Sequence, residues 1–81
     1  MKKISYFGKE YTVSGDIKWV ATGIAGYVET FKQKPSKAAL GWLYPDSLLD
    51  KLPSGSIDWK NSLRKVEDII VRENELKVRV S

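Results

Sequence analysis

Turn residues divide this chain into short segments in which apolar and polar side chains alternate. The segments "KKISYF" and "EYTV" alternate in this way around Gly8, which accepts the positive φ of a tight turn. A second pair of segments, 17–22 and 27–32, flanks the glycines of "GIAG". Pro35 follows the second of these segments. Because proline cannot donate a ladder hydrogen bond, it marks the end of that pair. The first part of the chain therefore predicts two β-hairpins.

The aromatic residues of the second hairpin are candidates for its packed face. Alternation places Trp19 and Ala21 on one face of the first strand, and Tyr27 and Phe31 on one face of the second. A chain of 81 residues has a thin core, in which each large side chain counts. We expect these four residues to be packed, which leaves "KQKP" at 32–35 as a basic rim.

The next two segments predict a strand and a short helix. The segment "GWLY" favours a strand at 40–44, after a loop. In "PDSLLDKLP" at 45–53, Asp46 is a candidate N-cap, and Pro53 ends the segment. An apolar side is supplied by Leu48, Leu49 and Leu52.

The clearest helical pattern is "IDWKNSLRKVED". Asp58 is a candidate N-cap, and Trp59, Leu63 and Val66 recur with the spacing of one helix face. After it, "DIIVRENELKVRVS" predicts a third hairpin with its turn near 73–74 and an exposed edge strand at 75–80.

Together these segments predict one α+β domain over residues 1–81. About six short strands would form a small antiparallel β-sheet packed against one main helix near 58–66. A five-stranded barrel is the alternative architecture.

The charge of the chain is concentrated in its first half. The net charge is +4, and residues 2–37 contain seven lysines against three acidic residues. From Ala38 onward, seven basic residues balance seven acidic ones. A basic half attracts phosphates or an acidic protein face, although lysine is also a common solubilising surface residue.

The composition argues against most enzyme chemistry. The chain contains no Cys and no His, so it has no disulfide, no Cys nucleophile, no His base and none of the usual zinc ligands. Asp46 and Asp50, one helical turn apart, could hold Mg²⁺ or act as an acid–base pair, or could simply be a helix cap and a solvated carboxylate. We expect no enzymatic activity and no cofactor.

No segment approaches the roughly 20 apolar residues of a membrane span, and the two lysines near the start precede no apolar run. We therefore expect no membrane contact, no signal peptide and a cytoplasmic location.

Protein binding is the leading function that the residues suggest. The segment "GWLYP" places Trp42 and Tyr44 on one side of the chain, and exposed Trp and Tyr are common interface residues. Alternatively, Trp42 packs on the predicted helix through Trp59. The loop after Phe31 is basic, and loops on a rigid sheet commonly carry binding. The expected contacts with a partner are Lys32, Lys34, Lys37, Trp42 and Tyr44.

Nucleic-acid binding is the alternative that the same lysines allow. Trp19, Tyr27 and Phe31 among lysines loosely match a stacking surface, and Lys60 and Arg64 on the predicted helix could enter a major groove. A homo-oligomer that sequesters a signalling nucleotide is a further alternative. The oligomeric state and the partner remain open.

Several of these segments follow one another along the chain and together form a pattern: "FGKEYTV", "KWVAT", a Trp, "YP" and "IDWKNSL". The pattern resembles a group of small accessory proteins of tailed bacteriophages and prophages, which carry W-[IV]-A-x-D-x-x-G-x-[VI]-x-x-[FY]-x-x-x-P and a late D-W-x-x-S-L. The resemblance spans about residues 7–66, but "GIAG" replaces the usual acidic turn. The matching residues are Trp19, Val20, Ala21, Gly26, Val28, Phe31, Pro35, Trp42, Asp58, Trp59, Ser62 and Leu63.

The resemblance implies an early phage protein made in the cytoplasm of an infected bacterial host. Phages use many small non-enzymatic proteins to block host machinery or immunity. By this analogy, the expected partner is a host bacterial protein, such as a nuclease, a polymerase or a CRISPR effector.

Overall fold

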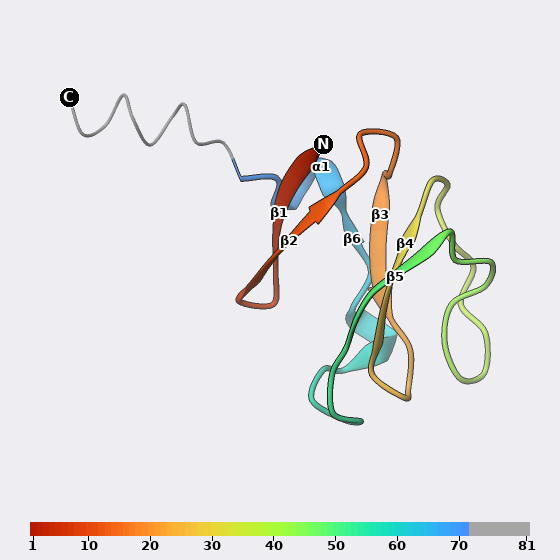
Figure 1. Cartoon of the computed structure of the whole chain (residues 1–81). Helices are drawn as coiled ribbons and strands as arrows, with labels where there is room; N and C mark the ends of the chain where they lie inside the picture. Colours follow the sequence, from red (N-terminus) through yellow and green to blue (C-terminus); the bar gives the residue numbers. More distant parts are fainter. Residues whose placement is uncertain (72–81) are drawn as a thin grey trace.

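The computed structural model describes residues 1–71, which form two antiparallel sheets and a short helix (Figure 1). The first sheet has the order β1-β2, and the second has the order β5-β4-β3-β6. A 3₁₀ turn, η1, and the helix α1 lie near the end of the described chain. The elements are β1 (Lys2–Tyr6), β2 (Lys9–Val13), β3 (Trp19–Thr22), β4 (Tyr27–Phe31), β5 (Ser47–Lys51), η1 (Trp59–Asn61), β6 (Arg64–Lys65) and α1 (Val66–Ile69).

The two predicted hairpins of the first part of the chain are confirmed. β1 pairs with β2 around a two-residue turn in which Phe7 and Gly8 have φ values of 48° and 80°. Two central residues with positive φ are what a type I′ turn requires. β3 pairs with β4, with Trp19 opposite Phe31 and Thr22 opposite Val28.

The turn between β3 and β4 depends on Gly26. Its φ is +93°, and a Cβ at this position would overlap the carbonyl oxygen of Leu52. The Leu52 N–H donates to the Gly26 carbonyl at 2.8 Å, which holds the two backbones at this close approach. Only glycine satisfies both the conformation and the space.

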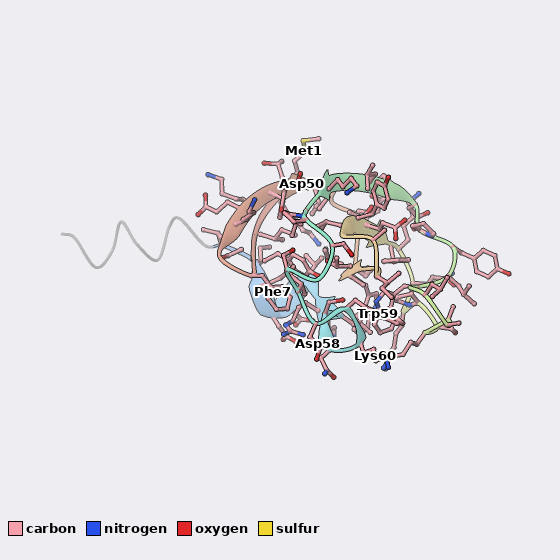
Figure 2. All side chains as sticks on the ribbon, turned by 90° about the horizontal axis from the view of Figure 1, so that it is seen from below. Met1, Phe7, Asp50, Asp58, Trp59 and Lys60 are labelled. Carbon is pink, nitrogen blue, oxygen red and sulfur yellow. The ribbon has the colours of Figure 1, made fainter. Side chains whose placement is uncertain are left out.

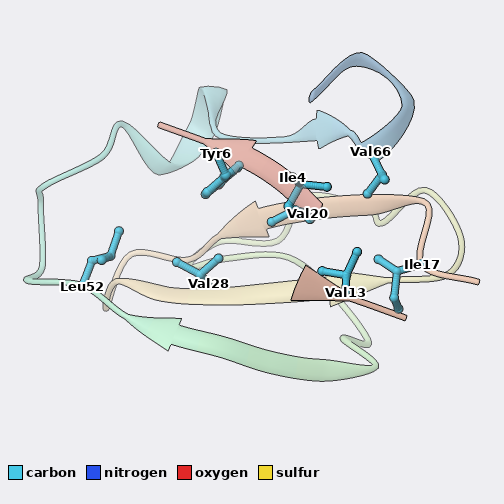
Figure 3. Close-up of a cluster of buried hydrophobic side chains, with 8 residues drawn as sticks. All are labelled: Ile4, Tyr6, Val13, Ile17, Val20, Val28, Leu52 and Val66. Atoms are coloured by element: carbon cyan, nitrogen blue, oxygen red, sulfur yellow. The ribbon is translucent and has the colours of Figure 1, made fainter. Parts of the chain in front are cut away.

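The core lies between the β1–β2 hairpin and one face of the four-stranded sheet (Figure 3). The hairpin contributes three of the eight core residues, and Val20 and Val28 contribute from the facing strands. The full set is Ile4, Tyr6, Val13, Ile17, Val20, Val28, Leu52 and Val66.

The main core lies on the face of β3–β4 opposite to the one predicted. Ala21 and Phe31 are buried, as expected, but on the outer face, which points away from the β1–β2 hairpin. On that face Trp19 is only half-buried and Tyr27 is exposed. Both faces carry apolar residues, so alternation alone does not identify the one that the hairpin covers.

Two predictions for the middle of the chain are wrong. The segment 40–44 is not a strand, and its pairing is limited to an isolated bridge between Trp42 and Lys37. The segment 45–53 is not a helix, because Ser47–Lys51 forms β5 and pairs with β4. The leucines that suggested a helix divide between two surfaces: Leu49 packs against the core and Leu48 is 57% exposed.

The predicted main helix near 58–66 is also wrong. The chain there makes η1, then β6 along the free edge of β3, and then the four-residue helix α1. Arg64 pairs with Val20, and the Val66 N–H donates to the Lys18 carbonyl at 2.8 Å. Hydrogen bonding to β3 therefore replaces helical bonding. The fold is a small, mostly antiparallel β structure with one short helix.

The predicted third hairpin begins within the described residues and continues beyond them. Its first residues are instead the end of α1, and Ile70 makes a bridge to Ile4 of β1. The Val71 N–H donates to the Lys3 carbonyl at 2.8 Å. The expected turn near 73–74 and the strand at 75–80 lie outside the described residues.

Candidate functional site

The loop 32–46 lies on the side of the molecule opposite to the β1–β2 hairpin (Figure 1). Asp46 holds its two ends together. The Lys32 N–H donates to Asp46 Oδ2 at 2.7 Å, and the Asp46 N–H donates to the Thr30 carbonyl at 2.7 Å. The side chain that was expected to cap a helix therefore closes the loop.

Trp42 attaches the loop to the body of the protein. Its Nε1–H lies 3.2 Å from the carbonyl oxygen of Thr22 and 3.3 Å from that of Trp59, and is shared between them. The Ala38 N–H also donates to the Gly41 carbonyl at 2.7 Å within the loop. Of the two roles considered for Trp42, the structure shows contact with the segment around Trp59.

The three lysines expected to contact a partner each have an internal partner. Lys34 Nζ lies 5.6 Å from the Trp19 ring centroid, and Lys37 Nζ lies 5.6 Å from that of Trp42. Lys32 Nζ lies 3.3 Å from Asp16 Oδ2. The hydrogen bonds of Asp16, first with Ser14 and then with Lys32, lower the pKa of its carboxyl group.

Tyr44, the aromatic residue of the expected set that lies beside Pro45, is almost fully exposed. Its side chain is 88% exposed, its φ is +59°, and it makes no hydrogen bond within residues 1–71. A positive φ is uncommon for a residue other than glycine, and it is least costly for Asn and Asp. The backbone is thus held in an unfavourable conformation while the ring faces solvent.

Two further loop residues were missed by the sequence analysis. Leu40 is 69% exposed, and Leu43 lies with Tyr44 along an open hollow of about 300 Å³. No local pattern in the sequence indicated their exposure. Gly41 and Gly23 approach closely enough that a Cβ on Gly23 would lie 3.7 Å from the Gly41 Cα.

Exposed apolar residues also lie outside the loop, on the β3–β4 turn, β4 and β5. The Ile24 N–H donates to the Leu40 carbonyl at 3.1 Å, which joins the β3–β4 turn to the loop. On the outer face of the sheet, Leu48 lies opposite Glu29, and Tyr27 lies two residues before Glu29 along β4. We name the exposed apolar residues of these segments the apolar patch. They are six of the eight exposed large hydrophobic residues of the described chain: Ile24, Tyr27, Leu40, Leu43, Tyr44 and Leu48.

Glu29 lies within the apolar patch as a half-buried carboxylate. It pairs with Ala21 and Leu48, next to the irregularity in β4. Burial raises the pKa of its carboxyl group, and it makes no hydrogen bond or ion pair within residues 1–71. A partner that covers this surface would meet one weakly solvated acid among apolar groups.

The two aspartates considered for metal or acid–base chemistry are not a pair. Four residues of extended chain separate their Cα atoms by about 13 Å. The Tyr11 hydroxyl donates to Asp50 Oδ2 at 2.8 Å, and Asp46 closes the loop. Within residues 1–71 no group of three His, Cys, Asp or Glu side chains is placed to bind a metal ion.

No helix within residues 1–71 is long and apolar enough to cross a membrane.

No protein-family model, curated protein or solved structure matches this chain. The resemblance to small phage proteins therefore stays a prediction.

Proposed function

We propose that this protein is a non-enzymatic binding protein that covers a surface of another protein with its apolar patch. The observation that carries the proposal is Tyr44. A large aromatic side chain is held outward on a positive φ, and the described part of the molecule gains no hydrogen bond from it. Tyrosine in such a position is typical of the few residues that supply most of the energy of an interface.

The surroundings of Tyr44 indicate the chemistry of the partner. Leu40 and Leu43 give the centre of the surface an apolar character, while Lys34 and Lys37 lie in the same loop. Lysines at the rim of an interface favour a partner with acidic groups and increase the rate of association. The partner in this proposal has an apolar depression with acidic residues around it.

The setting that we propose is an infected bacterium. In this proposal the protein is a phage product that blocks a host protein by occupying its surface, without turnover. The support is the resemblance carried by such residues as Trp19, Gly26 and Ser62, together with a surface suited to binding. Any host protein of the stated surface chemistry satisfies it, including a nuclease, a polymerase or a CRISPR effector.

The test uses Tyr44→Asn, because asparagine tolerates positive φ and lacks the ring. The tagged protein is used to capture host proteins from nuclease-treated bacterial extract, and the captured protein is purified. We expect Tyr44→Asn to weaken binding to it at least about tenfold, with unchanged or higher stability.

Phe7→Asn is the matched control. Phe7 also has a positive φ and is 47% exposed, but it lies in the turn of the β1–β2 hairpin, away from the loop. The Phe7→Asn substitution should leave the affinity for the captured protein unchanged. Equal binding by Tyr44→Asn and the unaltered protein would refute the proposal, as would the capture of host proteins from untreated extract only and of none from nuclease-treated extract.

A further inference from the structure

Lys and Arg side chains lie close to several aromatic rings in this protein. Within residues 1–71, five rings have a Lys or Arg within 6.0 Å of their centroid. The five include all three tryptophans of the chain, paired as Trp19–Lys34, Trp42–Lys37 and Trp59–Lys60.

The three tryptophan–lysine pairs are connected along β3. Trp19 begins this strand, and Thr22 ends it about 10 Å further along. The Trp42 Nε1–H contacts the Thr22 carbonyl and also the backbone carbonyl of Trp59, so the Trp42 indole and the Trp59 backbone lie beside the end of the strand. Figure 2 shows Trp59 and Lys60 on the side of the molecule away from Asp50. The half-buried Trp19 thus begins β3, and the half-buried Trp42 and Trp59 belong to segments that meet at its end.

Basic groups outnumber acidic ones along this path. Arg64 lies with its guanidinium 4.7 Å from the Phe7 ring centroid, and Lys65 pairs with Trp19 across β3 and β6. Two of the nearby acids have partners, whereas Glu29, opposite Ala21 on β3, is half-buried and has none within residues 1–71. Glu67 lies 3.4 Å from Lys65 Nζ, and Asp58 accepts a hydrogen bond from Asn61.

From this arrangement we infer that the three tryptophan–lysine pairs form a binding track for single-stranded nucleic acid. Such ligands combine a regular row of phosphates with flat bases, and proteins bind them with basic grooves and aromatic stacking platforms. Each pair offers both components at one place. The track shares Lys34 and Lys37 with the rim of the proposed protein-binding surface, but it does not use Tyr44, Leu40 or Leu43. This inference therefore does not depend on the proposed protein-binding function.

The energies favour exchange of each lysine for a base. An exposed cation–π contact is weaker than the stacking of a base on an aromatic ring. Lys34, Lys37 and Lys60 are exposed and lie near the outer limit of the cation–π distance. Each ammonium group can therefore move from its ring to a phosphate while a base takes its place.

An acidic peptide is a less suitable ligand for the same path. It would engage the lysines, but its carboxylates have no flat apolar surface to place on three indole rings. Stacking distinguishes the two ligands experimentally, because a base in contact with an indole quenches its fluorescence. All three tryptophans of the chain belong to the track, so intrinsic tryptophan fluorescence reports on this site alone.

The experiment titrates the full chain with a single-stranded oligo(dT) of about 15 nucleotides at several salt concentrations. We expect fluorescence quenching and a slope of log K against log salt of about −2, since three neutralised phosphates contribute about −0.7 each. The variant carrying Lys34→Gln, Lys37→Gln and Lys60→Gln should bind at least about tenfold more weakly with a slope near zero.

Lys51→Gln is the matched control, because Lys51 Nζ also lies over a ring, that of Tyr27 at 5.4 Å, but outside the track. This variant should retain the affinity and the quenching. The inference is overturned if oligo(dT) causes no quenching at low salt, if Lys51→Gln weakens binding as much as the triple variant, or if a poly-glutamate peptide quenches equally. Tyr44→Asn, the variant that tests the protein-binding proposal, should leave this titration unchanged. Either proposal can therefore fail while the other stands.

Discussion

The hydroxyl group of Ser62 binds the backbone of Thr22 in the interior of the protein. Ser62 Oγ accepts a hydrogen bond from the Thr22 N–H at 2.9 Å, and it lies 3.0 Å from the Thr22 carbonyl oxygen, a hydrogen-bonding distance. The Tyr6 hydroxyl donates to the Ser62 carbonyl at 3.0 Å and lies 2.7 Å from Thr22 Oγ1. One fully buried serine thus joins the end of β3 to the segment after η1 and to the β1–β2 hairpin.

Ser62→Ala should destabilise the fold by about 1–3 kcal/mol, because it leaves the buried Thr22 N–H without its acceptor. The free energy of unfolding, measured by urea denaturation, checks this. Ser5→Ala, at an exposed position of β1, is the control and should change that energy by less than about 0.5 kcal/mol. Equal effects of the two substitutions would show that the buried hydroxyl group contributes nothing specific.

Gly26→Ala should destabilise the protein by more than about 1 kcal/mol, because the new Cβ meets the Leu52 backbone at a positive φ. Gly15→Ala is the matched control, since a Cβ there has no neighbour within 4 Å and Gly15 has no positive φ. It should have a small effect of either sign. Thermal unfolding of both variants gives the comparison, and a Gly26→Ala variant as stable as the parent would contradict the observed approach of the two chains.

Tyr11→Phe should make the protein less sensitive to alkaline pH. Burial, and then the hydrogen bond to Asp50, raises the pKa of Tyr11 to about 12. A raised folded-state pKa means that the stabilisation is complete below the unfolded value of about 10 and is lost as the pH rises through about 12. Urea midpoints between about pH 8 and 12 should therefore fall more steeply for the parent than for Tyr11→Phe. Parallel curves would contradict this.

The same hydrogen bond lowers the pKa of Asp50, with a contribution from the Lys51 N–H. A lowered pKa gives stabilisation that is present above the unfolded value of about 4 and is lost as the pH falls. Tyr11→Phe should thus also reduce the acid sensitivity of the protein. A change confined to the alkaline side would show that Asp50 is not part of the interaction.

Glu29→Gln should stabilise the protein slightly at neutral pH, on the order of a few tenths of a kcal/mol after solvent screening. Burial raises the pKa of Glu29, so its ionisation opposes folding as the pH rises through the folded value. The gain should shrink as the pH falls below about 4, where the carboxyl group becomes protonated in both states. Glu10→Gln on exposed β2 is the control, and a loss of stability in Glu29→Gln would reveal a favourable interaction of the carboxylate.

The sequence predicted the hairpins because their turns are local. Gly8 and Gly26 provide the conformations that the turns need, and alternation specifies the strands on either side.

Residues 45–53 and 58–66 were misassigned because their pairing partners are distant. The spacing of Trp59, Leu63 and Val66 fits a helix, but the edge of β3 is available for Arg64 and Lys65. Tertiary hydrogen bonds therefore override the local pattern.

The candidate site was predicted in part. The sequence indicated Tyr44, and the structure shows it exposed, whereas Lys34 and Lys37 proved to lie over tryptophan rings. The exposure of Leu40 could not be predicted, because no local pattern marks it and its carbonyl is bound by the N–H of Ile24, which is distant in sequence. Contacts between distant segments decide which apolar residues are covered.

The closure of the loop by Asp46 has an evolutionary consequence. Its stems are joined at Thr30 and Lys32 by short hydrogen bonds, and none of the eight core residues comes from the segment 33–45. Lengthening a loop whose ends are already joined costs little, about 0.6 kcal/mol for each doubling. Apart from Trp42, which contacts the body of the protein, this segment can therefore change in length and sequence while the rest of the chain still folds. Related chains could then acquire new targets by exchanging one loop on an unchanged scaffold.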